Sequence, residues 1–217
     1  AVAQVELKTK QKDSPVGTNI YIEGGQFQFQ EPVQTVEGSN FSVKNLFYNV
    51  PARRKFLKND NVEFRHIIDE FQRVALAHES IEFELFHNDE PIFKLRKGGQ
   101  MQRIVDVFGR KLQPLLIPIR EDLGWVNLQG YVAKPEGAKK VRGEQFFFVN
   151  GRYFKSAYLS KAVQEAFDGL LQPGYIPSFF LYLELDPEKI DVNIHPQKTE
   201  VKFEDEALIF ALMSSTI

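Results

Sequence analysis

The stretch EQFFFVNGR, Glu144 to Arg152, decides the fold class of this chain. Three phenylalanines and a valine precede an Asn-Gly pair, which is typical of a buried strand that runs into a tight turn. A helical pattern follows from about Ser156 to Leu171, and the apolar run SFFLYLELD then extends to Asp186. A strand, a crossover helix and a second strand in this order predict an α+β fold with a right-handed crossover.

The chain on either side of this unit also alternates between strand and helix patterns. Upstream we expect a short helix that ends at Gly109, a strand from Trp125 to Lys134, and a polar loop that carries Lys139, Lys140 and Arg142. Downstream, IDVNIHPQKTEVKF (190–203) alternates around a His-Pro turn. The helix after it is expected to begin near Asp205 or Glu206.

The first half of the chain is dominated by the period-two alternation of strands. Within it Ile20 and Ile22 are predicted to share one face of a strand, and Phe27 and Phe29 one face of the next. A further strand is expected to end near Asn49.

Helical and hairpin patterns follow these strands. We expect a helical turn from Pro51 through Phe56 and Leu57, a helix over 61–77 capped by Asn59, Asp60 or Asn61, and a hairpin over 81–97. The breaker Lys97-Gly98-Gly99-Gln100 predicts a domain boundary, with one domain over 1–97 and another over 98–217.

Composition limits the function classes. The chain has 217 residues, 43% of them hydrophobic and 26% charged, which indicates a globular, soluble protein. The net charge of −2 does not indicate a nucleic-acid partner, although a local basic patch remains possible. The absence of cysteine excludes disulfides and thiolate metal sites, and four scattered histidines argue against zinc, so we expect no metal site. No run of about 18 apolar residues occurs, so no membrane span is expected.

The sequence contains none of the common catalytic or phosphate-binding motifs. Two basic features stand out instead. The first is a run of three cations, Arg53, Arg54 and Lys55, which follows a proline at a predicted helix start. The helix dipole disfavours cations at that end. The run is therefore either an anion-binding cluster or a solvated, salt-bridged one. Lys198 follows the His-Pro turn, and it is either a ligand for an anion or one more solvated lysine.

Three stretches together carry a resemblance to a known family. They are NLFYNVPARRKFL (45–57), FVNGR (148–152) and DVNIHPQKTEV (191–201). All three resemble signature blocks of the MutL family of DNA mismatch repair proteins, in the order and at the spacing of that family. The resemblance covers essentially the whole chain.

This resemblance implies a GHKL-class ATPase, as in gyrase-type topoisomerases. Residues 1–97 would be the C-terminal part of the ATPase α/β sandwich, and 98–217 a transducer domain similar to domain 2 of ribosomal protein S5. Lys198 matches the lysine that the second domain supplies to the ATP γ-phosphate, a catalytic and cofactor-binding role. Gly38 and Ser39 match a Gly-Thr pair whose hydroxyl helps to recognise adenine, with Ser in place of the commoner Thr.

The resemblance also implies what this chain lacks. The family's acidic base, its magnesium-binding Asn, the Asp that binds adenine and the glycine-containing lid all lie upstream of the matched region. The chain starts within a strand pattern and without Met, so we expect a fragment of a longer parent. The intact parent would use ATP and magnesium. The fragment is expected neither to bind ATP tightly nor to hydrolyse it.

DNA binding is the second function that the resemblance implies. Relatives carry a basic groove on the second domain and often have several arginines after the Asn-Gly-Arg motif, where this chain has Tyr153 and Phe154. The cations expected to contact DNA, non-specifically and in a salt-dependent way, are Arg53, Arg54, Lys55, Lys139, Lys140, Arg142, Arg152 and Lys155, with Lys161 as a further possibility.

The function that follows is an ATP-gated, homodimeric clamp of a bacterial cytoplasm. It would link the mismatch-recognition protein MutS to a downstream repair nuclease or helicase. Two alternatives stay open at this stage: a non-enzymatic nucleic-acid-binding module, and the transducer region of another GHKL ATPase such as a type II topoisomerase subunit.

Overall fold

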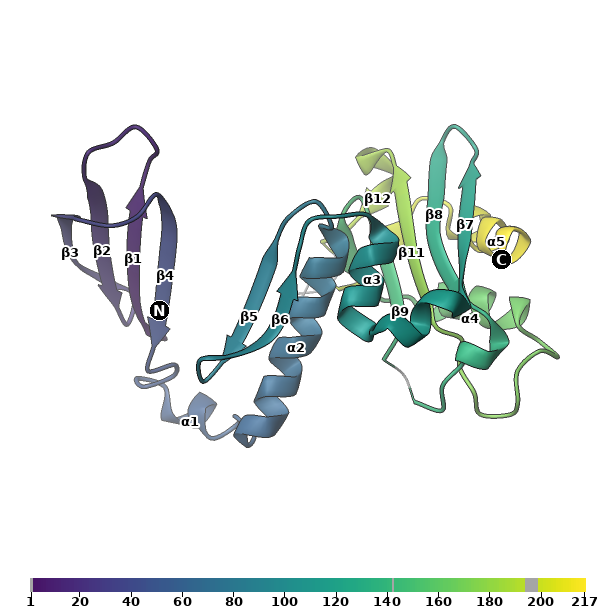
Figure 1. Ribbon diagram of the computed structural model, residues 1–217, viewed down its shortest axis with the longest axis horizontal. Helices are drawn as coiled ribbons and strands as arrows, with labels where there is room; N and C mark the ends of the chain where they lie inside the picture. Colours follow the sequence, from purple (N-terminus) through teal and green to yellow (C-terminus); the bar gives the residue numbers. More distant parts are fainter. Residues whose placement is uncertain (1, 142, 194–198) are drawn as a thin grey trace. The chain divides into compact units, whose positions relative to one another are not determined.

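The structure is a computed structural model that describes residues 2–141, 143–193 and 199–217. The chain forms two compact units, the first ending at His66 and the second beginning at Ile67 (Figure 1). No helix in the described part of the chain is long and apolar enough to cross a membrane.

The first unit is built on an antiparallel sheet of four strands in the order β3-β2-β1-β4 (Figure 1). These strands are β1 (Gln4–Lys10), β2 (Gly17–Glu23), β3 (Gln26–Val33) and β4 (Gly38–Lys44). Because directly paired residues share a face, the register gathers apolar side chains on one face: Val5, Leu7, Ile20, Ile22, Phe27, Phe41 and Val43. We call this set the apolar face of the first unit.

A bulge in β3 separates the two phenylalanines that the sequence places on one face. Phe27 pairs with Ile22 and Phe29 pairs with Tyr21, so the extra residue Gln28 interrupts the alternation. The rings of Phe29 and Tyr21 stack with their centroids 5.5 Å apart. The expectation that Phe27 and Phe29 share a face is therefore wrong, because the bulge moves Phe29 to the face opposite Phe27.

The chain leaves β4 earlier than its pattern predicts. Asn45 and Phe47 have positive φ angles of 52° and 62°, which an extended strand does not allow. The strand therefore ends at Lys44 and not near Asn49. Helix α1 (Pro51–Arg54) is also shorter than expected, since it ends before Phe56.

The second unit is built on a sheet of five strands in the order β10-β9-β11-β8-β7. The strands are β7 (Leu116–Asp122), β8 (Val126–Ala133), β9 (Gln145–Val149), β10 (Arg152–Phe154) and β11 (Phe179–Leu185). Strands β9 and β11 are parallel, and helix α4 (Ala157–Ala166) lies between them in sequence. The predicted strand, crossover helix and strand of an α+β fold are confirmed.

Both faces of this sheet are buried, and the alternation along the central strands decides which side chain enters which core. Phe147, Leu181 and Leu183 face a core shared with α4 and helix α5 (Glu206–Thr216). Phe146 and Phe180 face a second core. That second core is shared with α2 (Asp60–Ala77), α3 (Gln100–Phe108) and the hairpin β5 (Phe83–His87)–β6 (Glu90–Leu95).

Short elements complete the second unit. They are η1 (Arg110–Leu115), η2 (Pro135–Gly137), η3 (Pro187–Lys189), β12 (Ile190–Asp191) and β13 (Lys202–Phe203). Strand β8 also approaches β11 closely at Gly130. A Cβ atom there would lie 2.0 Å from the Phe180 carbonyl oxygen, so only glycine fits.

The division into compact units differs from the boundary expected near Lys97. Residues 67–97 pack with the second sheet, because Ala75, Leu76 and Leu95 belong to its second core. The hydroxyl of Tyr182 also donates to the Leu76 carbonyl oxygen at 3.1 Å. The division into an ATPase part over 1–97 and a transducer domain over 98–217 is a statement about family and function, and it stays a prediction.

Helix α4 is shorter than its apolar pattern predicts. It begins after Ser156, whose hydroxyl accepts from the Leu159 amide at 3.0 Å, and it ends at Ala166. The left-handed Gly169, with φ of 76°, turns the chain away. Leu170, expected on the buried stripe, is therefore 62% exposed.

Candidate functional site

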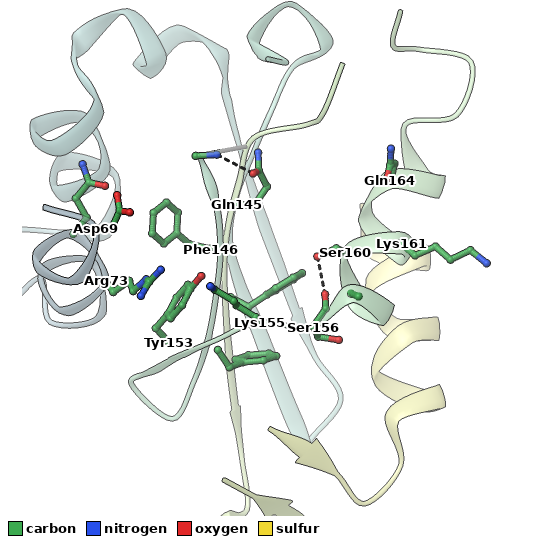
Figure 2. A pocket seen from close by; sticks show the side chains of 15 residues that line it. Asp69, Arg73, Gln145, Phe146, Tyr153, Lys155, Ser156, Ser160, Lys161 and Gln164 are labelled. Atoms are coloured by element: carbon green, nitrogen blue, oxygen red, sulfur yellow. Dashed lines mark hydrogen bonds between the residues drawn. The ribbon is translucent and has the colours of Figure 1, made fainter. Parts of the chain in front are cut away.

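A concave site in the second unit brings predicted functional residues together. It is an open pocket of about 490 Å³, lined by parts of α2, β9, β10 and the start of α4 (Figure 2). The pocket includes Lys155 and Lys161, two of the cations expected to contact DNA. It also includes Arg73, which the sequence did not single out.

Arg73 lies on α2 at the pocket wall. Its side chain is only 18% exposed, and it forms an ion pair with Glu70, one turn earlier on the same helix. The guanidinium carbon is 4.6 Å from the centroid of the Tyr153 ring, a cation–π contact. Burial raises the pKa of the Tyr153 hydroxyl, and Arg73 acts in the opposite direction.

Lys155 lies between β10 and α4, and its side chain and main chain face different partners. In Figure 2 the side chain extends toward Tyr153 and Arg73. The main-chain amide donates to the Thr199 carbonyl oxygen at 2.7 Å. The neighbouring Phe154 packs edge-on against Phe203 of β13 at 5.6 Å. The strand that ends at the pocket is thus tied to the chain just after residues 194–198.

The predicted γ-phosphate ligand, Lys198, lies outside the described residues, as does His195. The strands that flank this segment are described: β12 and β13 pair through Ile190 with Phe203 and Asp191 with Lys202. The pairing brings the two ends of the segment together. The predicted role of Lys198 stays a prediction.

The Asn-Gly turn of the FVNGR motif is anchored by its asparagine. Asn150 and Gly151 both have positive φ, 48° and 76°, as a two-residue hairpin turn requires. The Asn150 side chain donates to the Leu185 carbonyl oxygen at 2.9 Å and accepts from the Leu185 amide at 3.1 Å. This turn starts β10 and leaves Arg152 exposed.

Two of the cations expected to contact DNA, Lys139 and Lys140, lie in the polar loop before β9 and contact residues of the same unit. Lys139 forms an ion pair with Glu144, whose buried carboxylate also accepts from the Ser178 hydroxyl at 2.9 Å. Lys140 lies 5.4 Å from the centroid of the Tyr175 ring. Arg142 is outside the described residues. The partners of Lys139 and Lys140 close the loop onto the unit.

The other predicted site residues belong to the first unit. Arg53, Arg54 and Lys55 are exposed around α1. Because α1 has four residues, both arginines fall in its last turn, where the helix dipole favours cations. The expected conflict with the dipole does not arise.

The predicted adenine-binding pair lies at the start of β4. Gly38 has a φ of 108°, and the Ser39 hydroxyl is 2.8 Å from the Thr9 hydroxyl on the neighbouring strand. Ser39 is exposed, so its hydroxyl can also reach a ligand. The predicted adenine-binding role of the pair stays a prediction.

Only tertiary structure brings Arg73 together with Lys155, since 81 residues separate them in the sequence. The sequence carries no signal for Arg73, because at helical spacing it lies opposite the apolar stripe that contains Phe71, where a charged residue is ordinary.

Comparison with known proteins adds family and fold. The family model described as "DNA mismatch repair protein, C-terminal domain" matches residues 104–217. The DNA mismatch repair protein MutL of Flavobacterium johnsoniae is 53% identical over 217 residues, which cover 100% of this chain and 34% of that protein. The chain thus spans about a third of the length of the curated relatives it matches.

Solved structures resemble the chain in fold. The MutL ATPase domain of Aquifex aeolicus complexed with ADP gives a TM-score of 0.70 at 24% identity, covering 86% of this chain and 69% of that one. The B-subunit of DNA gyrase from Myxococcus xanthus gives 0.57 at 11% identity, covering 99% and 66%. The predicted relation to GHKL-type ATPases in fold is confirmed.

Proposed function

Because the chain belongs to the MutL family of DNA mismatch repair proteins, we propose that it is the part of an ATP-gated clamp that senses the γ-phosphate and contacts DNA. The observation that carries this proposal is the 53% identity that extends over all 217 residues. The matched length includes the residues around Lys198 and the Asn-Gly-Arg turn. In the whole protein the clamp is a homodimer that links MutS to a repair nuclease or helicase.

Lys198 is the residue proposed to sense the nucleotide. A lysine ammonium is a compact cation on a long stem, well suited to a terminal phosphate. The pairing of β12 with β13 and the bond from the Lys155 amide to Thr199 hold the chain on both sides of the segment that contains it. A contact between Lys198 and the phosphate would favour whichever arrangement of the protein allows it, so nucleotide state would bias conformation.

ATP is proposed as the nucleotide, with magnesium in the whole protein. The described residues that fit it are Gly38 and Ser39, since the Ser39 hydroxyl is exposed and its bond to the Thr9 hydroxyl leaves it capacity for one more partner. When bound, ATP supplies the γ-phosphate whose presence or loss switches the clamp. In this chain Gly38 and Ser39 would contact the adenine, and Lys198 would contact the γ-phosphate and stabilise its negative charge.

The test is steady-state ATP hydrolysis by the full-length protein in which this chain occurs. Lys198→Ala should lower the rate about ten-fold or more, which corresponds to about 1.4 kcal/mol of transition-state stabilisation. Lys202→Ala is the matched control, because Lys202 is an exposed lysine of β13 close in sequence. An equal rate in the Lys198→Ala variant and the control would contradict the proposed role.

A further inference from the structure

We propose that the pocket of the second unit binds one phosphate group of the DNA backbone between Arg73 and Lys155, with the Tyr153 hydroxyl as a third donor. This inference rests on the DNA-binding function proposed above and deepens it. It assigns a phosphate subsite and adds Arg73, on a helix that precedes the predicted second domain, to the surface that contacts DNA.

Arg73 is suited to the role because its side chain is a largely desolvated cation and not all of its N–H donors are used. Its side chain is 18% exposed, whereas that of its partner Glu70 is 68% exposed. A guanidinium carries five N–H donors. The bond to Glu70 and the stacking over Tyr153 do not use them all. The planar donors of arginine match the oxygens of a phosphate.

Tyr153 and Lys155 face the same end of the pocket. Figure 2 shows the Lys155 side chain extending toward Tyr153 and Arg73. Tyr153 is itself held by edge-on contacts with Phe146 at 5.9 Å and Phe148 at 6.0 Å. The hydroxyl is thus fixed in position by packing, and its raised pKa keeps it protonated as a donor.

The charge of the lining favours an anion. Arg73, Lys155 and Lys161 contribute three cations, and Asp69 is the acidic residue in the lining. Lys161 takes little part, because it extends away from Arg73 in Figure 2 and pairs with Glu165 at 3.4 Å.

The number of donors favours phosphate over a carboxylate. One carboxylate is satisfied by a single guanidinium fork. This pocket adds the Lys155 ammonium and the Tyr153 phenol beside that fork. The exposed Arg152, at the start of β10, can contact a neighbouring phosphate of the same strand. DNA is therefore the partner that the pocket fits.

The experiment measures binding of a fluorescein-labelled single-stranded oligonucleotide to this chain by anisotropy over a series of salt concentrations. Arg73→Gln and Lys155→Gln should each reduce the slope of log K against log salt by about 0.7, the value for one phosphate contact on a single strand. Arg65→Gln is the charge-matched control and should keep the wild-type slope. Arg65 is exposed and outside the pocket lining.

Folding is checked by urea unfolding, because Arg73→Gln also removes packing over Tyr153. Lys155→Gln keeps its main-chain amide and therefore tests the pocket with less structural change. If the wild type binds in a salt-dependent way and all three variants keep its slope, the pocket is overturned but DNA binding is not.

The absence of salt-dependent binding by the wild type would overturn the proposed DNA-binding function as well. A third outcome would reassign the pocket. If Arg73→Gln and Lys155→Gln bound the oligonucleotide normally but lost binding to polyglutamate, the pocket would be a site for an acidic protein and not for DNA.

Discussion

At the scale of the single residue, Arg103 joins the segments of the second unit that the sequence assigned to different domains. Its guanidinium donates to the carbonyl oxygens of Ala75, Glu79, Ile81 and Arg96 at 2.6 to 3.1 Å. The first of these belongs to the last turn of α2, where a cation also meets the favourable end of the helix dipole. Burial lowers the pKa of Arg103, so the charge depends on these bonds for its stability.

Arg103→Met is therefore expected to destabilise the second unit by about 3 kcal/mol or more, because several buried carbonyl groups lose a charged donor. Urea unfolding monitored by the fluorescence of Trp125, the one tryptophan in the chain, measures this change. Arg110→Met is the control, since Arg110 is exposed and should change stability by less than about 0.5 kcal/mol. Similar effects of the two substitutions would mean that the carbonyl bonds contribute little.

At the scale of the element, the turn between β9 and β10 explains why the Asn-Gly-Arg motif needs asparagine. Asn150 tolerates the left-handed conformation better than most residues, and its side chain continues the sheet by pairing with Leu185 in both directions. The turn sets where β10 begins, and β10 places Tyr153 and Lys155 at the pocket.

Asn150→Gly and Asn150→Ala should separate the two contributions of this side chain. Glycine keeps the backbone conformation and loses two hydrogen bonds, a cost of about 1 to 3 kcal/mol. Alanine loses the same bonds and adds backbone strain of about 1 kcal/mol or more. Thermal unfolding should rank wild type above Asn150→Gly and Asn150→Gly above Asn150→Ala. Equal stability of all three would show that neither the bonds nor the conformation matters.

At the scale of the whole molecule, the two units differ in how completely they bury their apolar residues. The second unit covers both faces of its sheet. On the apolar face of the first unit, Phe27, Phe41 and Val43 are 62%, 67% and 60% exposed. Contiguous apolar surface of this kind marks a region that associates with other apolar groups.

This chain by itself should therefore bind the dye 8-anilinonaphthalene-1-sulfonate through the apolar face. Phe41→Ser should remove a large part of the dye fluorescence, because it replaces the most exposed ring of that face with a hydroxyl. Phe29→Ser is the matched control: Phe29 is a partly exposed phenylalanine of the same sheet on the opposite face. An equal loss of fluorescence in both variants would contradict this assignment.

Sequence patterns predicted the elements better than their ends. The Asn59 side chain caps α2, with its oxygen 3.1 Å from the Val62 amide, and Asp205 caps α5 with its oxygen 3.0 Å from the Leu208 amide. Both caps follow from local chemistry. The early end of β4, the bulge at Gln28 and the early end of α4 do not, since each depends on positive φ angles or on pairing with a distant strand.

The sequence by itself determined the family and the α+β class, because these follow from residue order and period. Only the tertiary structure decided which cations act together. It engaged Lys139 with Glu144, tied Lys155 to Thr199, and placed Arg73 beside Tyr153. The physical reason is that charges meet through the packing of distant elements, and neither spacing nor composition records that packing.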